Sequence, residues 1–417
     1  MLNTKIKNIS VKIKEYIIYL LFSLHIFFWG IDYNFVRPKF FIFLLFFFII
    51  FNLNKIILNK LFKYFLISLI IFLHLFFQAE IFFLNYLYFT IGLFLILIIS
   101  DVYQKFFLNN LNKIIYIFLI FFFSFLIFQF FFQYISSKEV NNICIGCFSY
   151  YRIFFKENSH LALIAPSVIF YLLFISNYNK VNSFLLISFI AICIINNTLT
   201  LYVGLTFLVT LTIFFKIKKN NFQKIILTLI TFLAVLSLSI DKTAQAKLAD
   251  TLKIMPFWTL DILVKTTDII DHNKKRSNEK KINLSMEIYK TSLIITKNAL
   301  LHKPFGYGFN NYNEAFNQFI QNIDVYNWET RGLNTKDGSN TFVKIVVEFG
   351  IFSLFFFYFL ISFFFNSKID NRIKIFLILP ILIQLCIRGV GYFNGGFLLF
   401  SFYALVLWLK ANSRNNL

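Results

Sequence analysis

Long apolar runs alternate with short polar segments along most of the chain, and this alternation predicts its elements. A helix that crosses a bilayer needs about 20 consecutive apolar residues, and the sequence holds about twelve runs that approach this length. They centre on 16–31, 39–53, 64–79, 81–100, 114–135, 159–176, 182–196, 198–215, 222–240, 341–366, 372–388 and 393–410. The pattern therefore predicts an all-α, polytopic integral membrane protein.

One polar segment, 241–340, is much longer than the others and carries 11 of the 19 acidic residues, as expected of a folded unit outside the membrane. Within it, NLSMEIYKTSLIITKNALLHKP has apolar residues at helical spacing and a proline stop, which predicts an amphipathic helix. Gly306 and Gly308 of PFGYGF predict a tight turn after that helix. The chain thus divides into nine helices in 1–240, the loop 241–340, and three helices with a tail in 341–417.

Composition and charge support a membrane protein and indicate how its helices are oriented. Hydrophobic residues make up 59% of the chain and 63 residues are Phe, while charged residues reach only 14%. The net charge of +21 does not indicate nucleic-acid binding, because Lys and Arg are scattered between the apolar runs, where they orient helices. With the N-terminus inside, 19 Lys and Arg face the cytoplasm and 6 lie on short outer segments. The positive-inside rule then places both termini in the cytoplasm and the long loop outside.

Three arginines are predicted to lie at the outer face of the membrane. Arg152 precedes the sixth apolar run, Arg331 lies in the long loop, and Arg388 ends the eleventh run. A guanidinium offers a fork of donors to phosphate oxygens, so three of them would suit a diphosphate. The alternative is that they anchor helices at the interface or form surface ion pairs.

Glu157 and His160 are three residues apart and would share a face of a helix, as a base and its orienting partner would. Alternatively, Glu157 is a charge at a helix N-terminus and Ser159 a cap, although His160 within an apolar run costs energy unless it faces a cavity.

Lys344 and Glu348 are four apart in the tenth run and could pair with each other; the alternative is that Glu348 with Gly350 sets the packing of the helix. His74 is interpreted as a packing residue. The sequence has no HExxH, Walker, GxSxG or Cys/His metal pattern.

In its topology and in two motifs, the chain resembles the superfamily of O-antigen ligases and O-antigen polymerases, bacterial membrane glycosyltransferases. HKPFGYGFNNYNEAF matches the family's P-[LF]-G-x-G turn. GSNTFVKIVVEFGIFSL matches its HN-x-[FL]-x(5)-E-x-G entry into the tenth span, through Asn340, Phe342, Glu348 and Gly350. In the ligases the residue before this Asn is typically a His, whereas Ser339 stands here, which favours a polymerase.

The resemblance implies inverting glycosyl transfer at the periplasmic face of the bacterial inner membrane, without nucleotide sugar, metal or other cofactor. The donor would be a glycan on undecaprenyl diphosphate. The acceptor would be a second lipid-linked repeat unit in a polymerase, or lipid A-core in a ligase, and a chain-length regulator is a further candidate partner. On this view Arg152, Arg331 and Arg388 bind the diphosphate, Glu157 or His160 is the base, and Gly306, Gly308, Asn340 and Glu348 support the loop.

A transporter or flippase of a lipid-linked or anionic solute is the alternative from another class. It predicts two related halves and interrupted helices near the midplane of the membrane. The sequence favours the enzyme, because its ionisable residues collect at the outer face and its extramembrane mass is on one side.

Overall fold

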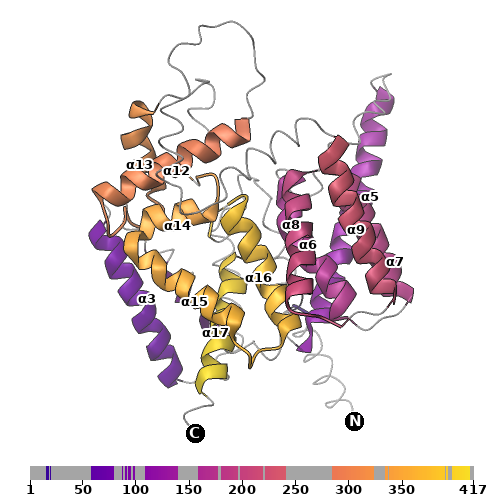
Figure 1. Ribbon diagram of the computed structural model, residues 1–417, viewed down its shortest axis with the longest axis horizontal. Helices are drawn as coiled ribbons and strands as arrows, with labels where there is room; N and C mark the ends of the chain where they lie inside the picture. Colours follow the sequence, from indigo (N-terminus) through magenta and orange to yellow (C-terminus); the bar gives the residue numbers. More distant parts are fainter. Residues whose placement is uncertain are drawn as a thin grey trace, which may run out of the picture.

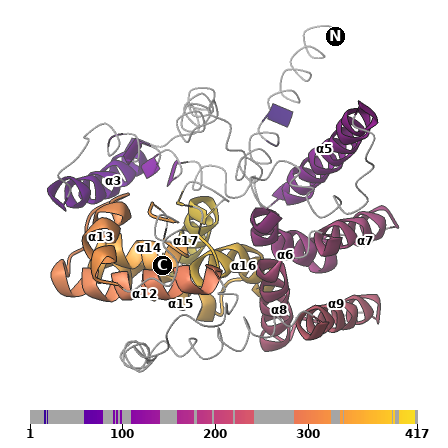
Figure 2. The same cartoon turned by 90° about the horizontal axis from the view of Figure 1, so that it is seen from above.

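The computed structural model describes a bundle of helices and, on one end of it, a smaller layer of helices (Figures 1 and 2). The residues described are 58–78, 109–139, 158–176, 180–195, 198–218, 221–240, 284–323, 334–336, 338–389, 391–392 and 397–413, with single positions between 16 and 19 and between 87 and 98. They form helices and turns and no strand, which confirms the all-α prediction for this part of the chain.

The helices follow the apolar runs wherever the structure describes them. In the first part of the chain they are α3 (Leu58–Gln78), α5 (Leu111–Glu139), α6 (Asn158–Phe174), α7 (Lys180–Ile195), α8 (Leu199–Phe214) and α9 (Asn221–Ile240). In the second part they are α12 (Leu284–His302), α13 (Tyr312–Phe319) with the 3-10 turn Ile320–Asn322, α14 (Thr341–Phe349), the 3-10 turn η7 (Gly350–Phe352), α15 (Ser353–Phe365), α16 (Asn371–Cys386) and α17 (Phe397–Ser413). The runs 16–31 and 39–53 lie almost entirely outside the described residues.

Helix α6 lies at the centre of the bundle, between α7, α8 and α16 (Figure 2). Its residues from Leu161 to Phe174 are buried on every side, so its apolar sequence reflects a core position. Close approach to α8 depends on Gly204, where a Cβ would lie 2.7 Å from Cγ of Pro166 and 3.0 Å from Cδ1 of Ile383. The glycine thus marks the place where α6, α8 and α16 meet.

Helices α6 and α16 run antiparallel. Tyr171, near the end of α6, contacts Phe376, near the start of α16, with ring centroids 5.8 Å apart. Pro166 and Ile383, further toward the opposite ends, both meet Gly204. The start of α6 and the end of α16 therefore lie at the same end of the bundle.

The smaller layer consists of α12 and α13, which pack on α14 (Figure 1). Its own apolar core comprises Ile295, Ala299, Tyr307, Tyr312, Ala315, Phe316, Ile320, Val343 and Val347. The predicted helix before PFGYGF is confirmed as α12. The short helix α13 was not predicted, because eight residues within a polar loop carry little periodic signal.

The single helix predicted for 341–366 is interrupted. Gly350 has a φ of 55°, which ends α14 after nine residues, and one 3-10 turn leads into α15. By length and composition, Thr341–Phe365 as a whole is the one stretch among the described residues that is long and apolar enough to cross a membrane. The number of crossings in the chain stays a prediction.

Large apolar side chains are exposed on several helices around the bundle. Ile70 of α3, Phe184 of α7, Ile225 of α9 and Phe355 of α15 are each 66–72% exposed. A soluble protein rarely leaves contiguous apolar faces in water. Exposed apolar faces of this kind are typical of surfaces that contact another protein or a membrane.

Candidate functional site

The turn that follows α12 is built by a proline and two glycines. Pro304 lies two residues after the end of α12, and the Gly306 amide donates to the carbonyl of Lys303 at 2.9 Å. Gly306 and Gly308 have φ values of 95° and 89°, which other residues rarely adopt. The tight turn predicted at PFGYGF is confirmed.

This turn docks onto the C-terminal end of α14 through the backbone. The amides of Tyr307 and Gly308 donate to the carbonyls of Val347 and Glu348 at 2.9 and 3.0 Å. In return, the Ile351 amide donates to the Pro304 carbonyl at 2.9 Å. The last carbonyls of a helix have no hydrogen-bond donor within the helix. Because α14 is interrupted at Gly350, the amides of the turn donate to the Val347 and Glu348 carbonyls instead.

Both backbones approach too closely for a side chain between them. A Cβ on Gly306 would lie 2.3 Å from the carbonyl oxygen of Glu348. A Cβ on Gly350 would lie 2.1 Å from the carbonyl oxygen of Pro304. The glycines of the two sequence motifs therefore belong to one interlocking contact, which we call the turn–helix lock (residues 303–308 with 347–351).

The N-terminal end of α14 meets the end of α16. Asn340 caps α14, its Oδ1 accepting from the Val343 amide at 2.9 Å. The Gly389 amide donates to the Ser339 carbonyl at 3.3 Å, and a Cβ on Gly389 would lie 2.5 Å from the Thr341 nitrogen. The chain position of Arg388, the residue before Gly389, is therefore close to the Asn340 cap.

Helix α12 also reaches this end of α14. Burial raises the pKa of Tyr289, the Cys386 thiol adds to the rise, and the Asn340 side chain lowers it. The three groups come from α12, α16 and the cap of α14. This end of the bundle and the smaller layer thus converge on Asn340.

Glu348 is fully buried and connects the turn–helix lock to the segment that follows α16. Its Oε2 accepts a hydrogen bond of 2.7 Å from the Tyr392 hydroxyl. Lys344 Nζ lies 3.8 Å from Oε1, which confirms the predicted pair as an ion pair without a hydrogen bond. Lys344 Nζ also donates to the Lys336 carbonyl at 3.0 Å and lies over the Tyr392 ring. Tyr392 was missed, because nothing in GVGYFNGG indicates which helix it faces.

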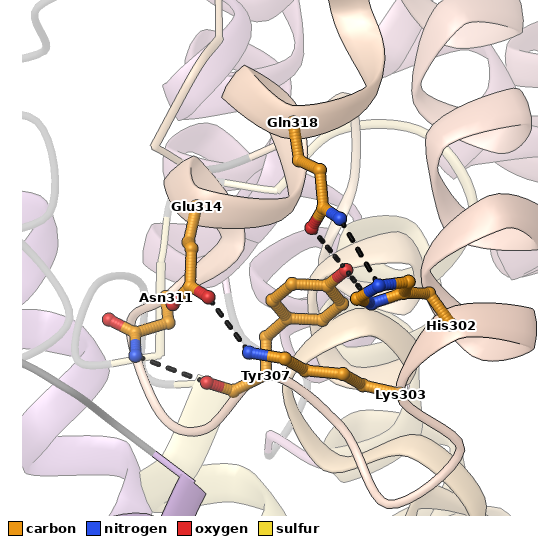
Figure 3. A network of polar contacts seen from close by, with 6 residues as sticks. All are labelled: His302, Lys303, Tyr307, Asn311, Glu314 and Gln318. Atoms are coloured by element: carbon orange, nitrogen blue, oxygen red, sulfur yellow. Dashed lines mark hydrogen bonds and ion pairs between the residues drawn. The ribbon is translucent and has the colours of Figure 1, made fainter.

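A second polar network ties the end of α12 to α13 (Figure 3). Lys303 pairs with Glu314 at 2.9 Å, and the Tyr307 hydroxyl donates to Gln318 Oε1 at 2.8 Å. That hydroxyl has one hydrogen, so His302 Nδ1, 3.2 Å away, must donate to it. These partners hold α13 in place over the turn, and the bonds lie on the side of the turn that faces α13.

The structure brings together only part of the predicted site. Gly306, Gly308 and Glu348 meet in the turn–helix lock, while Gly389, the residue after Arg388, meets the backbone of the Asn340 cap at the other end of α14. Arg152, Glu157 and Arg331 lie outside the described residues, so the convergence of three arginines stays a prediction. His160 belongs to the first turn of α6, at the same end of the bundle as Arg388, and its side chain is not described.

Within the described part of the chain, no group of three His, Cys, Asp or Glu side chains is arranged to hold a metal ion. Cys193 and Cys386 are free thiols there, whereas Cys144 and Cys147 lie outside the described residues. No protein-family model, no curated protein and no solved structure matches the chain.

Proposed function

We propose that the chain is a polytopic glycosyltransferase of the inner membrane that polymerises oligosaccharide repeat units carried on undecaprenyl diphosphate. The observation that carries the proposal is the turn–helix lock: two motifs about 40 residues apart, each weak alone, form one contact through their glycines. The exposed apolar faces of α3, α7, α9 and α15 support a lipid environment. Ser339, in place of the histidine of the ligases, favours polymerisation over ligation to lipid A-core.

The reaction requires a base, a leaving group and charge to receive it. The acceptor hydroxyl attacks the anomeric carbon of the donor glycan and gives its proton to Glu157 or His160. The bond between that carbon and the diphosphate oxygen breaks, and its electron pair leaves with undecaprenyl diphosphate. Arg388, with Arg152 and Arg331, would stabilise the charge that develops on the diphosphate. The backbone contact between Gly389 and Ser339 fixes the segment that carries Arg388.

Deletion of the gene in its native host tests the reaction. We expect the surface polysaccharide to lose its ladder on a gel and to retain a core with a single repeat unit. A bare core with polymer accumulating on undecaprenyl diphosphate would instead indicate a ligase. Unchanged polysaccharide would contradict both enzymes and favour a transporter of a lipid-linked or anionic solute.

Arg388→Ala tests the site, with Arg372→Ala as its matched control at the opposite end of α16. Removing one charge that stabilises a transition state costs about 3 kcal/mol, or a hundredfold in rate. We expect Arg388→Ala to abolish the ladder at normal protein level and Arg372→Ala to complement fully. Full complementation by Arg388→Ala would exclude this arginine from the diphosphate site.

A further inference from the structure

We propose that the turn Lys303–Gly308 is a re-entrant element that dips into the outer leaflet of the bilayer, with Phe305 in contact with lipid acyl chains. The inference names a lipid-binding surface of the extramembrane layer. It rests on the proposed function only in requiring that the chain is embedded in a membrane.

The first observation is a continuous apolar surface. Phe305 is 57% exposed, and its ring lies 5.9 Å from that of Phe352, which lies 6.5 Å from that of Phe355. With the exposed Ile351, these residues form what we call the outer aromatic patch. The patch continues along α15 into Tyr358, within the stretch Thr341–Phe365 that is long and apolar enough to cross a membrane.

The second observation is depth. Asn366 is the first polar residue after α15, and Phe352 precedes it by 14 positions, which is about 21 Å along a helix. The hydrocarbon core of a bilayer is about 30 Å thick. With Asn366 placed at the inner boundary and α15 along the bilayer normal, Phe352 and its neighbour Phe305 would lie about 9 Å below the outer boundary, the depth at which interfacial elements bury their apolar faces.

The third observation is how the turn satisfies its backbone. Irregular backbone is tolerated at membrane depth only where protein groups bind its amides and carbonyls. The Pro304 carbonyl accepts from Ile351, the Phe305 carbonyl accepts from Nε2 of His74 in α3 at 3.0 Å, and the Gly306 amide donates to Lys303. Tyr307 and Gly308 donate to α14, as described above. His74, interpreted from sequence as a packing residue, therefore also donates a hydrogen bond to the backbone of the turn.

The charges of this region are directed away from the outer aromatic patch. Lys303 Nζ reaches Glu314 of α13 and lies 4.6 Å from the centre of the Tyr307 ring, so its ammonium group faces the smaller layer (Figure 3). His74 stacks on Phe349 and meets Phe352 edge-on. The exposed part of the turn, Pro304 and Phe305, is thus apolar, while Lys303 and His74 are paired on its other side.

Quenching by brominated lipid tests the proposal on the full chain. The four native tryptophans (Trp29, Trp258, Trp328 and Trp408) are replaced by Phe, and one Trp is introduced by Phe305→Trp, Phe355→Trp or Asn317→Trp. Asn317 is exposed on α13 and serves as the control. In phosphatidylcholine vesicles brominated on the acyl chains, we expect the Trp at 305 and at 355 to lose about half of their emission, as acyl-chain contact requires, and the Trp at 317 to lose none.

The outcomes separate this inference from the proposed function. Quenching at 355 without quenching at 305 would overturn the re-entrant turn and leave the membrane assignment standing. No quenching at either position would contradict the membrane assignment itself. Cross-linking between copies through Phe305→Cys, without quenching at 305, would make the outer aromatic patch a contact between two chains and overturn the inference.

A second measurement avoids the replacement of the tryptophans. Phe305→Cys and Asn317→Cys are treated in native membranes with a charged, membrane-impermeant maleimide, and the unsubstituted chain gives the background of its own cysteines. A thiol among acyl chains stays protonated and out of reach of the reagent. We expect labelling of Asn317→Cys only, and equal labelling of both would contradict the proposal.

Discussion

Gly306 and Gly350 lie where two backbones approach more closely than any side chain permits. Substitution by Ala places a Cβ 2.3 and 2.1 Å from carbonyl oxygens, on residues with positive φ. The strained φ alone costs about 1–3 kcal/mol, and the overlap with backbone atoms adds to it. We expect Gly306→Ala and Gly350→Ala to lower the melting temperature of the purified protein strongly or to prevent its accumulation.

Gly338→Ala is the matched control for this prediction. Gly338 also has a positive φ, of 64°, but its added Cβ would lie no closer than 3.3 Å to the Tyr312 ring and Val343. We therefore expect Gly338→Ala to cost the strained φ and a small shift of these two side chains, and to lower the melting temperature less than the other two substitutions. A melting temperature reduced equally in all three variants would contradict the turn–helix lock.

The hydrogen bond from Tyr392 to Glu348 joins two segments 44 residues apart. Removing one partner leaves a buried carboxylate oxygen without a donor, at a cost of about 1–3 kcal/mol. We expect Tyr392→Phe to lower the free energy of unfolding by this amount. In combination with Glu348→Gln the two effects should not add, and a double-mutant cycle measures this. Tyr358→Phe, on the exposed face of α15, is the control and should leave stability unchanged.

At the scale of elements, α14 connects the bundle and the smaller layer, and its two ends make different contacts. The turn hydrogen-bonds to its C-terminal end, and the segment that carries Arg388 hydrogen-bonds to the residue before its N-terminal cap.

The sequence predicted α12, the turn and most helices of the bundle, because each shows helical periodicity or a proline–glycine pattern. The interruption at Gly350 was not predicted, because a single glycine inside a helical run does not show whether the helix breaks there or packs closely.

The cap of α14 gives a prediction at this scale. Asn340→Ala removes a side-chain cap and should cost about 1 kcal/mol. Thr198→Ala removes the cap of α8, where Oγ1 accepts from the Leu201 amide at 3.3 Å, and should cost a similar amount. We expect only Asn340→Ala to shorten the polysaccharide ladder, because it also loosens the contact with Gly389. Ladders of equal length in both variants would show that the Asn340 cap contributes to the stability of the protein and not to its activity.

At the scale of the whole molecule, the smaller layer lies at one end of the bundle and α17 ends at the other (Figure 1). With the proposed orientation, α13 faces the periplasm and the end of α17 faces the cytoplasm. We expect a membrane-impermeant thiol reagent to label Asn317→Cys from the outside and to reach Asn412→Cys only after the membrane is opened. Labelling of Asn412→Cys in intact cells would contradict the orientation drawn from the positive-inside rule.

By itself, the sequence determined the helical class, the separate polar segment and the positions of the two glycine motifs. These follow from periodicity, from the distribution of charge and from residues that only a turn accommodates. The partner of each motif was decided by the tertiary structure alone. Glu348 bonds Tyr392 and Gly306 meets Glu348 because α14 is interrupted and α16 ends against its cap. Contacts of this kind depend on the positions at which helices cross, and these positions produce no periodic pattern in the sequence from which they could be predicted.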